Sequence, residues 1–219
     1  MRAMEKKLVA YMKQHRVIGS VRTSDFFTAK QVAGAMLTGG IKVFEVSLSI
    51  SGWAEIFKRL QTDTEIVVGA GAVTNVKQAY AAVEKGARFI STPGVIPNLI
   101  RAIKNEKVMS IVGAFTPTEV YQAMDAGADI VEIFPAANSG GPVYLSRLKS
   151  NFPEVDFIAS GGVEIKDFCD YLDNGASMVV VGEDIARQEW LNNRDFNSVI
   201  SASTQVVAAA RSYNSENSD

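Results

Sequence analysis

Cysteine and histidine are scarce in this chain of 219 residues, and neither charge is in large excess. Cys169 is the only cysteine, which excludes an intramolecular disulfide. His15 is the only histidine and precedes the first strand-like run, so neither a His/Cys metal cluster nor a Ser-His-Asp triad is expected. The formal net charge is -2 and no basic run occurs, which argues against nucleic acid as a partner.

Long hydrophobic runs are missing as well. No stretch approaches the roughly 20 apolar residues that are needed to span a bilayer. Segment 1–7 is too charged to lead a signal peptide, and no small-residue cleavage site follows an apolar core. We therefore expect a cytoplasmic protein with no membrane partner. With 47% hydrophobic and 21% charged residues, the composition is that of an ordinary globular protein.

Eight short apolar runs alternate with helical runs along the chain. Short strands that are almost wholly apolar are typical of a parallel sheet covered by helices. Eight such units in about 200 residues predict an α/β fold, the compact (β/α)8 TIM barrel. A doubly wound sheet is the alternative, although Gly69-Ala70-Gly71-Ala72-Val73 lacks the third glycine of the dinucleotide fingerprint. The predicted strands are 17–21, 42–48, 66–70, 88–92, 109–113, 129–134, 156–160 and 177–181.

The segments between the strands carry helix boundaries. Glycine follows several helical runs and predicts a left-handed C-terminal cap at Gly39-Gly40, Gly86, Gly127 and Gly175. Capping chemistry predicts helix starts at Thr28, Thr74, Thr116 and Ser139. Segment 4–14 is expected to form an extra helix that plugs the bottom of the barrel. Residues 1–211 are then a single barrel domain, and residues 212–219 are a polar, frayed tail.

Two glutamates, Glu45 and Glu132, lie inside otherwise apolar strands. Burying a carboxylate is costly unless it is paired or neutralised. A structural ion pair with Arg22 is one explanation, but a single arginine cannot fully balance two glutamates. Because active groups of such barrels sit at the C-terminal ends of the strands, we favour a functional role for both residues. At least one of them is expected to have a raised pKa or another partner.

Two loops bear on whether the ligand carries phosphate. Ser160-Gly161-Gly162-Val163, after the seventh predicted strand, resembles a phosphate-cradling loop with a helix N-terminus behind it. An ordinary Gly-Gly turn is the alternative. The loop after the eighth strand argues against phosphate, because Gly182-Glu183-Asp184 places two negative charges where a dianion needs donors.

The motifs that carry a family resemblance extend from about residue 16 to residue 207. Taken in order, they resemble the KDPG and KHG aldolases, which act on 2-keto-3-deoxy-6-phosphogluconate and 4-hydroxy-2-oxoglutarate. The matching segments are Arg22, Phe44-Glu45-Val46-Ser47-Leu48, Val68-Gly69-Ala70-Gly71, Ser91-Thr92-Pro93-Gly94, Thr116-Pro117-Thr118-Glu119, Ile133-Phe134-Pro135-Ala136, Gly141-Pro142 and Ser160-Gly161-Gly162-Val163.

The resemblance implies a homotrimeric barrel lyase of carbohydrate metabolism that forms pyruvate from a small 2-oxo acid without a cofactor. It implies that Glu45 is the general acid/base and that Arg22 lies near the substrate carboxylate. The other substrate contacts are expected at Thr92, Pro93, Phe134, Ser160, Gly161, Gly162, Gly182 and Glu183.

The chain departs from the family pattern where the chemistry is carried. In the family, a lysine two places before Phe-Pro forms a Schiff base with pyruvate, but here Glu132 occupies that position. A carboxylate cannot form an imine. Ser49, Ala72 and Glu183 replace the arginine, threonine and serine that are usual at their positions. None of the twelve lysines is predicted at the C-terminal end of a strand.

Three functions remain open at this point. The first is a lyase that performs aldol cleavage or decarboxylation of a 2-oxo acid without a Schiff base. In that case Glu45 and Glu132 would hold Mg²⁺ or Mn²⁺ as an electron sink, with Asp184 or the substrate as a further ligand. The second is a catalytically inactive small-anion binder or trimeric scaffold. The third is an isomerase that uses Glu45 and Glu132 as acid and base.

Overall fold

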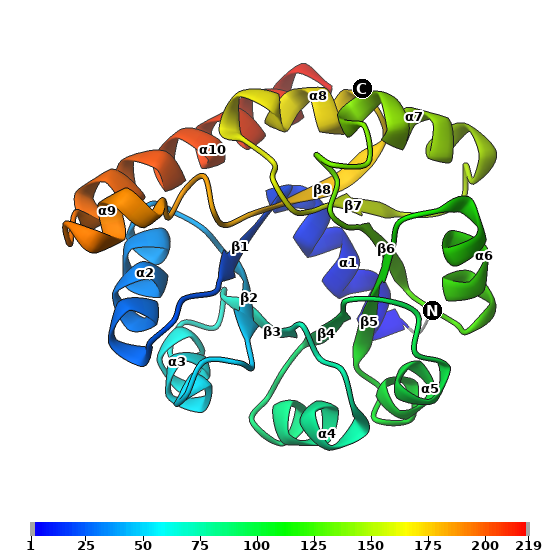
Figure 1. The fold of residues 1–219 in the computed structure, drawn as a ribbon, viewed down its shortest axis with the longest axis horizontal. Helices are drawn as coiled ribbons and strands as arrows, with labels where there is room; N and C mark the ends of the chain where they lie inside the picture. The colour runs from blue at the N-terminus through cyan, green and yellow to red at the C-terminus, as the bar shows by residue number, and fades with distance from the viewer. Residues whose placement is uncertain (1–2, 218–219) are drawn as a thin grey trace.

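The strands form one closed parallel barrel in the computed structural model, which describes residues 3–217 (Figure 1). Consecutive strands pair in chain order, and the last strand returns to pair with the first. The fold is therefore the predicted (β/α)8 TIM barrel and not a doubly wound sheet. The strands are β1 (Val17–Val21), β2 (Val43–Ser47), β3 (Val67–Gly71), β4 (Phe89–Thr92), β5 (Met109–Ala114), β6 (Ile130–Ile133), β7 (Phe157–Ala159) and β8 (Ala176–Val181).

Helices surround this barrel and separate its strands (Figure 1). No helix among the described residues is long and apolar enough to cross a bilayer. The helices are α1 (Ala3–His15), α2 (Phe26–Thr38), α3 (Trp53–Leu60), α4 (Val76–Glu84), α5 (Pro97–Asn105), α6 (Pro117–Asp125), α7 (Gly141–Asn151), α8 (Phe168–Asp173), α9 (Gln188–Asn192) and α10 (Phe196–Glu216), with a 3-10 turn at Ile165–Asp167.

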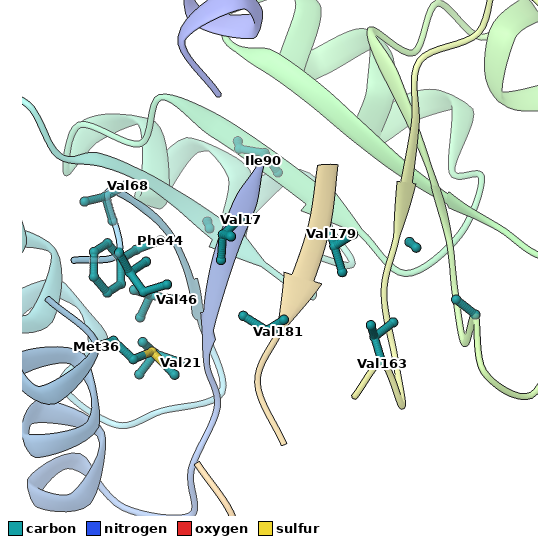
Figure 2. Close-up of a cluster of buried hydrophobic side chains, with 14 of the residues drawn as sticks. Val17, Val21, Met36, Phe44, Val46, Val68, Ile90, Val163, Val179 and Val181 are labelled. Carbon is teal, nitrogen blue, oxygen red and sulfur yellow. The ribbon is translucent and has the colours of Figure 1, made fainter. Parts of the chain in front are cut away.

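The apolar core has two layers, because successive side chains of a strand point to opposite faces. Outward-facing side chains of the strands pack against the helices; Figure 2 shows Val21 of β1 and Val46 of β2 beside Met36 of α2. Inward-facing side chains form a separate cluster in the lower half of the barrel, which includes Val43 and Ile130. This inner layer fixes the height at which the interior changes from apolar to polar.

Helix α1 closes the bottom of the barrel, as the sequence predicted. Its Leu8, Val9 and Met12 join the inner cluster, and Met12 is fully buried. Figure 1 shows α1 lying across the ring of strands. His15 ends this helix with its ring 4.5 Å from that of Tyr11, far from any strand's C-terminal end. The open end of the barrel is consequently the opposite one, at the C-terminal ends of the strands.

Helix ends confirm some of the predicted boundaries and correct others. Gly40, Gly86, Gly127 and Gly175 all adopt positive φ after a helix, and Thr116 caps α6 in a capping box with Glu119. The predicted starts at Thr28, Thr74 and Ser139 were wrong. Asp25 and Asn75 cap α2 and α4, because their side chains accept hydrogen bonds from the backbone N–H groups of Thr28 and Gln78, and α7 follows Gly140.

The C-terminal helix is longer than expected. Helix α10 runs to Glu216, so most of the segment that was predicted as a frayed tail is helical, while residues 218–219 lie outside the described residues. The side chain of Asn214 accepts a hydrogen bond from Arg16 Nε at 2.9 Å and donates one to the Gln14 carbonyl at 2.8 Å. These bonds tie the last turns to the body of the barrel.

Candidate active site

Strand alternation builds a polar layer directly above the apolar inner cluster. Phe89, Ile130 and Ile158 belong to that cluster, and the side chain two residues further along each of these three strands faces the same way. The next inward-facing residues of these strands are polar: Ser91, Glu132 and Ser160. Glu45 is placed in the same way, two residues after Val43.

Glu132 is the buried member of the glutamate pair, with 6% of its surface exposed. Ser91 Oγ donates a hydrogen bond of 2.8 Å to Glu132 Oε2, and the Ser160 hydroxyl also hydrogen-bonds to this carboxylate. Burial raises the pKa of Glu132 above its usual value, while these two hydrogen bonds favour the ionised form and oppose the rise.

Glu45 keeps partial access to solvent and lies directly against the backbone of β3. A Cβ atom added to Gly71 would come within 2.5 to 2.6 Å of Oε1, Cδ and Cγ of Glu45. The pKa of Glu45 is raised to about 8, mainly by burial and also by the charge of Glu132, whereas the Ser91 hydroxyl and Arg22 oppose the rise. At neutral pH the carboxyl of Glu45 is therefore largely protonated.

Ser91 connects the two glutamates and was missed at the sequence level. Thr92 was selected at the end of this strand instead, but it is fully buried and its hydroxyl donates to the Gly94 carbonyl at 2.9 Å. The signal that was overlooked is the alternation of side-chain direction along the strand. Ser91 lies two residues after Phe89 and therefore points inward as well.

A cavity of about 660 Å³ lies at the C-terminal end of the barrel, and neither Glu45 nor Glu132 is among the residues that line it. Ser160, which hydrogen-bonds to Glu132, and Ser20, which pairs in register with Glu45, belong to both the cavity wall and the polar layer below. Thr92 and the exposed Pro93 do not line the cavity. The predicted substrate-binding residues in its wall are Arg22, Phe134, Ser160, Gly161, Gly162, Gly182 and Glu183.

Arg22 is exposed in this cavity and is not consumed by a structural ion pair. No salt bridge within 4 Å joins it to Glu45 or to Glu132. It affects Glu45 only as a nearby positive charge. The structure therefore shows no direct ion pair between Arg22 and either glutamate, and the guanidinium lies in the cavity wall.

The Gly-Gly loop lacks part of the phosphate cradle that was expected. Gly161 and Gly162 have φ of +85° and +73°, and a Cβ at Gly161 would meet the Phe134 ring at 2.9 Å. However, α8 begins only at Phe168, after the 3-10 turn. The backbone N–H of Ile165, in the first residue of that turn, already donates to Asp184 Oδ2 at 2.8 Å. A carboxylate of the protein thus occupies the donor that an anion would use.

The described residues contain no group of three or more His, Cys, Asp or Glu side chains arranged to hold a metal ion. Asp184, which was considered as a third ligand beside Glu45 and Glu132, is committed to Ile165 and to Arg187. A cation in the barrel would therefore need ligands from the substrate. Among the described residues that line the cavity there is also no lysine, so no amine nucleophile replaces Glu132 there.

The fold and this site define a class of protein: a (β/α)8 barrel with two carboxyl groups in its interior and an exposed arginine in a cavity at the C-terminal ends of its strands, where barrel enzymes place their active sites. The chain belongs to the KDPG and KHG aldolase family, whose sequence model matches residues 8–202.

Curated relatives agree with this assignment. The chain is 28% identical over 197 residues to the 2-dehydro-3-deoxy-phosphogluconate aldolase of Treponema pallidum, with 90% of this chain and 94% of the relative covered. It is 33% identical over 158 residues to the enzyme of the same name from Zymomonas mobilis, with 72% and 76% covered.

Solved structures show the same likeness. A KDPG aldolase of Legionella pneumophila, with pyruvate captured as a covalent carbinolamine intermediate, superposes with a TM-score of 0.80 at 28% identity, and the match covers 90% of this chain and 97% of that one. The 2-keto-3-deoxy-6-phosphogluconate aldolase of Zymomonas mobilis with 3-phosphoglycerate gives a TM-score of 0.82 at 27% identity, with 93% and 96% covered.

Proposed function

We propose that this protein is a lyase that cleaves a carbon–carbon bond of a small 2-oxo acid and releases pyruvate without forming a Schiff base. The observation that carries this proposal is the pair of carboxyl groups, Glu45 and Glu132, which interact inside the barrel in different surroundings, next to a cavity that contains Arg22. Paired carboxyls whose environments separate their pKa values are suited to act as acid and base.

Without an imine, the reaction needs another way to accept the electron pair of the broken bond. In the proposed reaction, the electron pair of the broken bond moves into the 2-oxo group, and an enol of pyruvate forms. The neutral carboxylic acid of Glu45 donates its proton to the developing enolate oxygen, as a carboxylic acid kept neutral by its environment can do. Arg22 holds the substrate carboxylate and thereby orients the 2-oxo group.

Glu132 supplies the base in the aldol reaction. Its carboxylate accepts the proton of the C4 hydroxyl as the C3–C4 bond breaks and the aldehyde departs. When the enol returns to the ketone, the enol proton goes back to Glu45 and the proton on Glu132 is transferred to C3, so both groups regain their starting states. In decarboxylation, CO₂ leaves instead, and the proton on C3 comes from solvent.

A divalent cation is a second way to supply the electron sink. We propose Mg²⁺ or Mn²⁺ as the ion to test, because hard carboxylate ligands suit both. Glu45 and Glu132 would be its protein ligands, and the 2-oxo acid would have to complete the coordination. A bound cation would stabilise the enolate as a Lewis acid.

The decisive experiment measures pyruvate release from KDPG, 4-hydroxy-2-oxoglutarate and oxaloacetate, with Mg²⁺ or Mn²⁺ and again with a chelator. Release that survives the chelator and is lost in Glu132→Gln supports the carboxylate mechanism. Release that the chelator abolishes supports the cation. Release that persists in Glu132→Gln contradicts the assignment of Glu132 as base.

A catalytically inactive binder of small anions is the second candidate, favoured by the exposed Arg22 in the cavity, which would hold a carboxylate with or without turnover. Thermal stabilisation by pyruvate, without release from any of the three substrates, would support it. A carboxylate-based isomerase would instead convert a 2-oxo acid without releasing pyruvate.

A homotrimer is proposed for the assembly. Large apolar side chains are exposed around α6, α7 and the open ends of β5 and β6, at Phe115, Tyr121, Phe134 and Val143, and such exposure often marks a protein interface. Sedimentation velocity measures the mass in solution, and a concentration-independent monomer would contradict the trimer.

A further inference from the structure

The cavity is much larger than pyruvate requires and has a polar, uncharged side. Its volume is about 660 Å³, whereas sites for drug-sized ligands begin at about 300 Å³. Gln188 and Asn192 of α9 line it, and Gln188 Nε2 donates to Asn192 Oδ1 at 2.8 Å. This bond orients both amides and leaves the Asn192 NH₂ and the Gln188 carbonyl for a ligand. Hydroxyl groups of Thr23 and Ser24 lie in the same wall.

The charges in the wall favour a ligand with a single negative charge. Among the described residues that line the cavity, Arg22 is the one cation, while Asp25 and Glu183 carry carboxylates. Asp25 is occupied as the N-cap of α2, but Glu183 is exposed and has no ion pair within 4 Å. An ionised carboxylate accepts hydrogen bonds and repels a second anion.

Each of the two loops that would hold a phosphate has a carboxylate next to its glycines. Asp184 occupies the Ile165 N–H behind the Gly-Gly loop, and Glu183 stands beside Gly182 in the facing loop. A phosphate dianion placed there would meet the Glu183 carboxylate, whereas sugar hydroxyls can donate to a carboxylate and accept from an amide at the same place.

We propose that the cavity takes a 2-oxo acid with an unphosphorylated polyhydroxy tail, whose carboxylate binds Arg22 and whose distal hydroxyls bind Glu183, Gln188 and Asn192. This inference rests on the proposed function for its 2-oxo acid end. The tail follows separately from the size of the cavity and from the sign of the charges in its wall.

The test compares two ligands that differ only in the phosphate, 2-keto-3-deoxygluconate and its 6-phosphate. Isothermal titration uses the Glu132→Gln protein, so that neither ligand is consumed. We expect the unphosphorylated acid to bind at least tenfold more tightly. Glu183→Gln in the same background should strengthen binding of the 6-phosphate about tenfold, because it removes a like charge, and should change binding of the unphosphorylated acid by much less.

Glu189→Gln is the matched control. Glu189 is an exposed carboxylate of α9 outside the cavity wall, so the same loss of charge there should leave both affinities unchanged. Equal or tighter binding of the 6-phosphate by the Glu132→Gln protein would overturn the proposal.

The titration and the turnover assay separate this inference from the proposed function. If neither sugar acid binds, yet the wild-type protein releases pyruvate from oxaloacetate, the polyhydroxy tail is wrong and the lyase stands. If the unphosphorylated acid binds tightly and the wild-type protein does not cleave it or any other 2-oxo acid, the ligand class stands and the lyase fails.

Discussion

The hydroxyl of Ser91 joins the two carboxyl groups of the site, because it donates to Glu132 Oε2 at 2.8 Å and also hydrogen-bonds to Glu45. A hydroxyl has one proton to donate and two lone pairs to accept with. Its one proton is donated to Glu132, and the Ser91 hydroxyl also opposes the rise in the pKa of Glu45. One serine thereby favours the ionised form of both carboxyl groups.

Ser91→Ala tests this arrangement. Loss of the donor should raise the pKa of Glu132 further and lower the free energy of unfolding by about 1–3 kcal/mol once Glu132 is ionised. Urea denaturation at several pH values measures this cost, which should grow as pH rises. Ser203→Ala is the control, since that buried hydroxyl donates to the Val199 carbonyl within α10. Equal pH profiles for the two variants would contradict the role given to Ser91.

Glu45→Gln tests the raised pKa of Glu45. The folded-state pKa is about 8, well above the value of about 4.3 in an unfolded chain. Between these values the unfolded chain has lost a proton that the folded protein keeps, so stability falls as pH rises through this range. We expect wild type to lose up to a few kcal/mol of unfolding free energy between pH 5 and pH 9.

The Gln variant has no such proton to lose at position 45. It should match wild type near pH 5, show a shallower loss with rising pH and be the more stable protein at pH 9, as measured by urea denaturation. Glu189→Gln, at an exposed position, should keep the wild-type slope. A Glu45→Gln slope as steep as that of wild type would show that Glu45 has an ordinary pKa.

The sequence was enough to predict the barrel because two independent patterns agree on it. The apolar runs specify the strands, and β1 matches its predicted bounds at Val17–Val21. Glycines such as Gly86 and Gly127 separately mark where helices end, and both have the positive φ that was expected. The placement of Glu45 and Glu132 in one polar layer followed from the same rule, since catalytic groups of barrels lie at the C-terminal ends of strands.

Features that depend on side-chain direction were not predictable in the same way. The choice between Ser91 and Thr92 needed the phase of a four-residue strand, which its short apolar run leaves open. The hydrogen bond from Ile165 N–H to Asp184 joins two residues that are 19 positions apart in the sequence. Which glutamate keeps the proton depends on burial and on hydroxyl groups from other strands, and a linear pattern does not record these.

Glu132→Lys tests whether the scaffold still supports imine chemistry. The new amine would stand where the family places its Schiff-base lysine, close to Glu45. Burial and the neutral acid beside it would allow a fraction of the amine to be unprotonated. Incubation with pyruvate and borohydride, followed by mass spectrometry, should show a covalent adduct in Glu132→Lys and none in wild type. Glu189→Lys, at an exposed surface position, should remain unmodified. An adduct on wild type would mean that another amine of the chain reacts.

Gly71→Ala tests whether the close contact between Glu45 and the backbone of β3 determines the pKa of Glu45. The added Cβ would come within 2.5 to 2.6 Å of the Glu45 side chain, and Gly71 does not have the positive φ that disfavours alanine. Glu45 must therefore move away from the barrel interior toward solvent. Its pKa should fall toward the ordinary value, and overpacking should cost about 1–3 kcal/mol of stability.

Gly94→Ala provides the matched control, because a Cβ there meets nothing within 4 Å. The pH dependence of urea denaturation should flatten in Gly71→Ala and stay unchanged in Gly94→Ala, and any pyruvate-releasing activity should fall at least tenfold in the first variant alone. If Gly71→Ala keeps both the wild-type pH slope and full activity, then the contact with β3 does not position Glu45. In that case burial in the barrel and the charge of Glu132 would be enough by themselves to keep its proton in place.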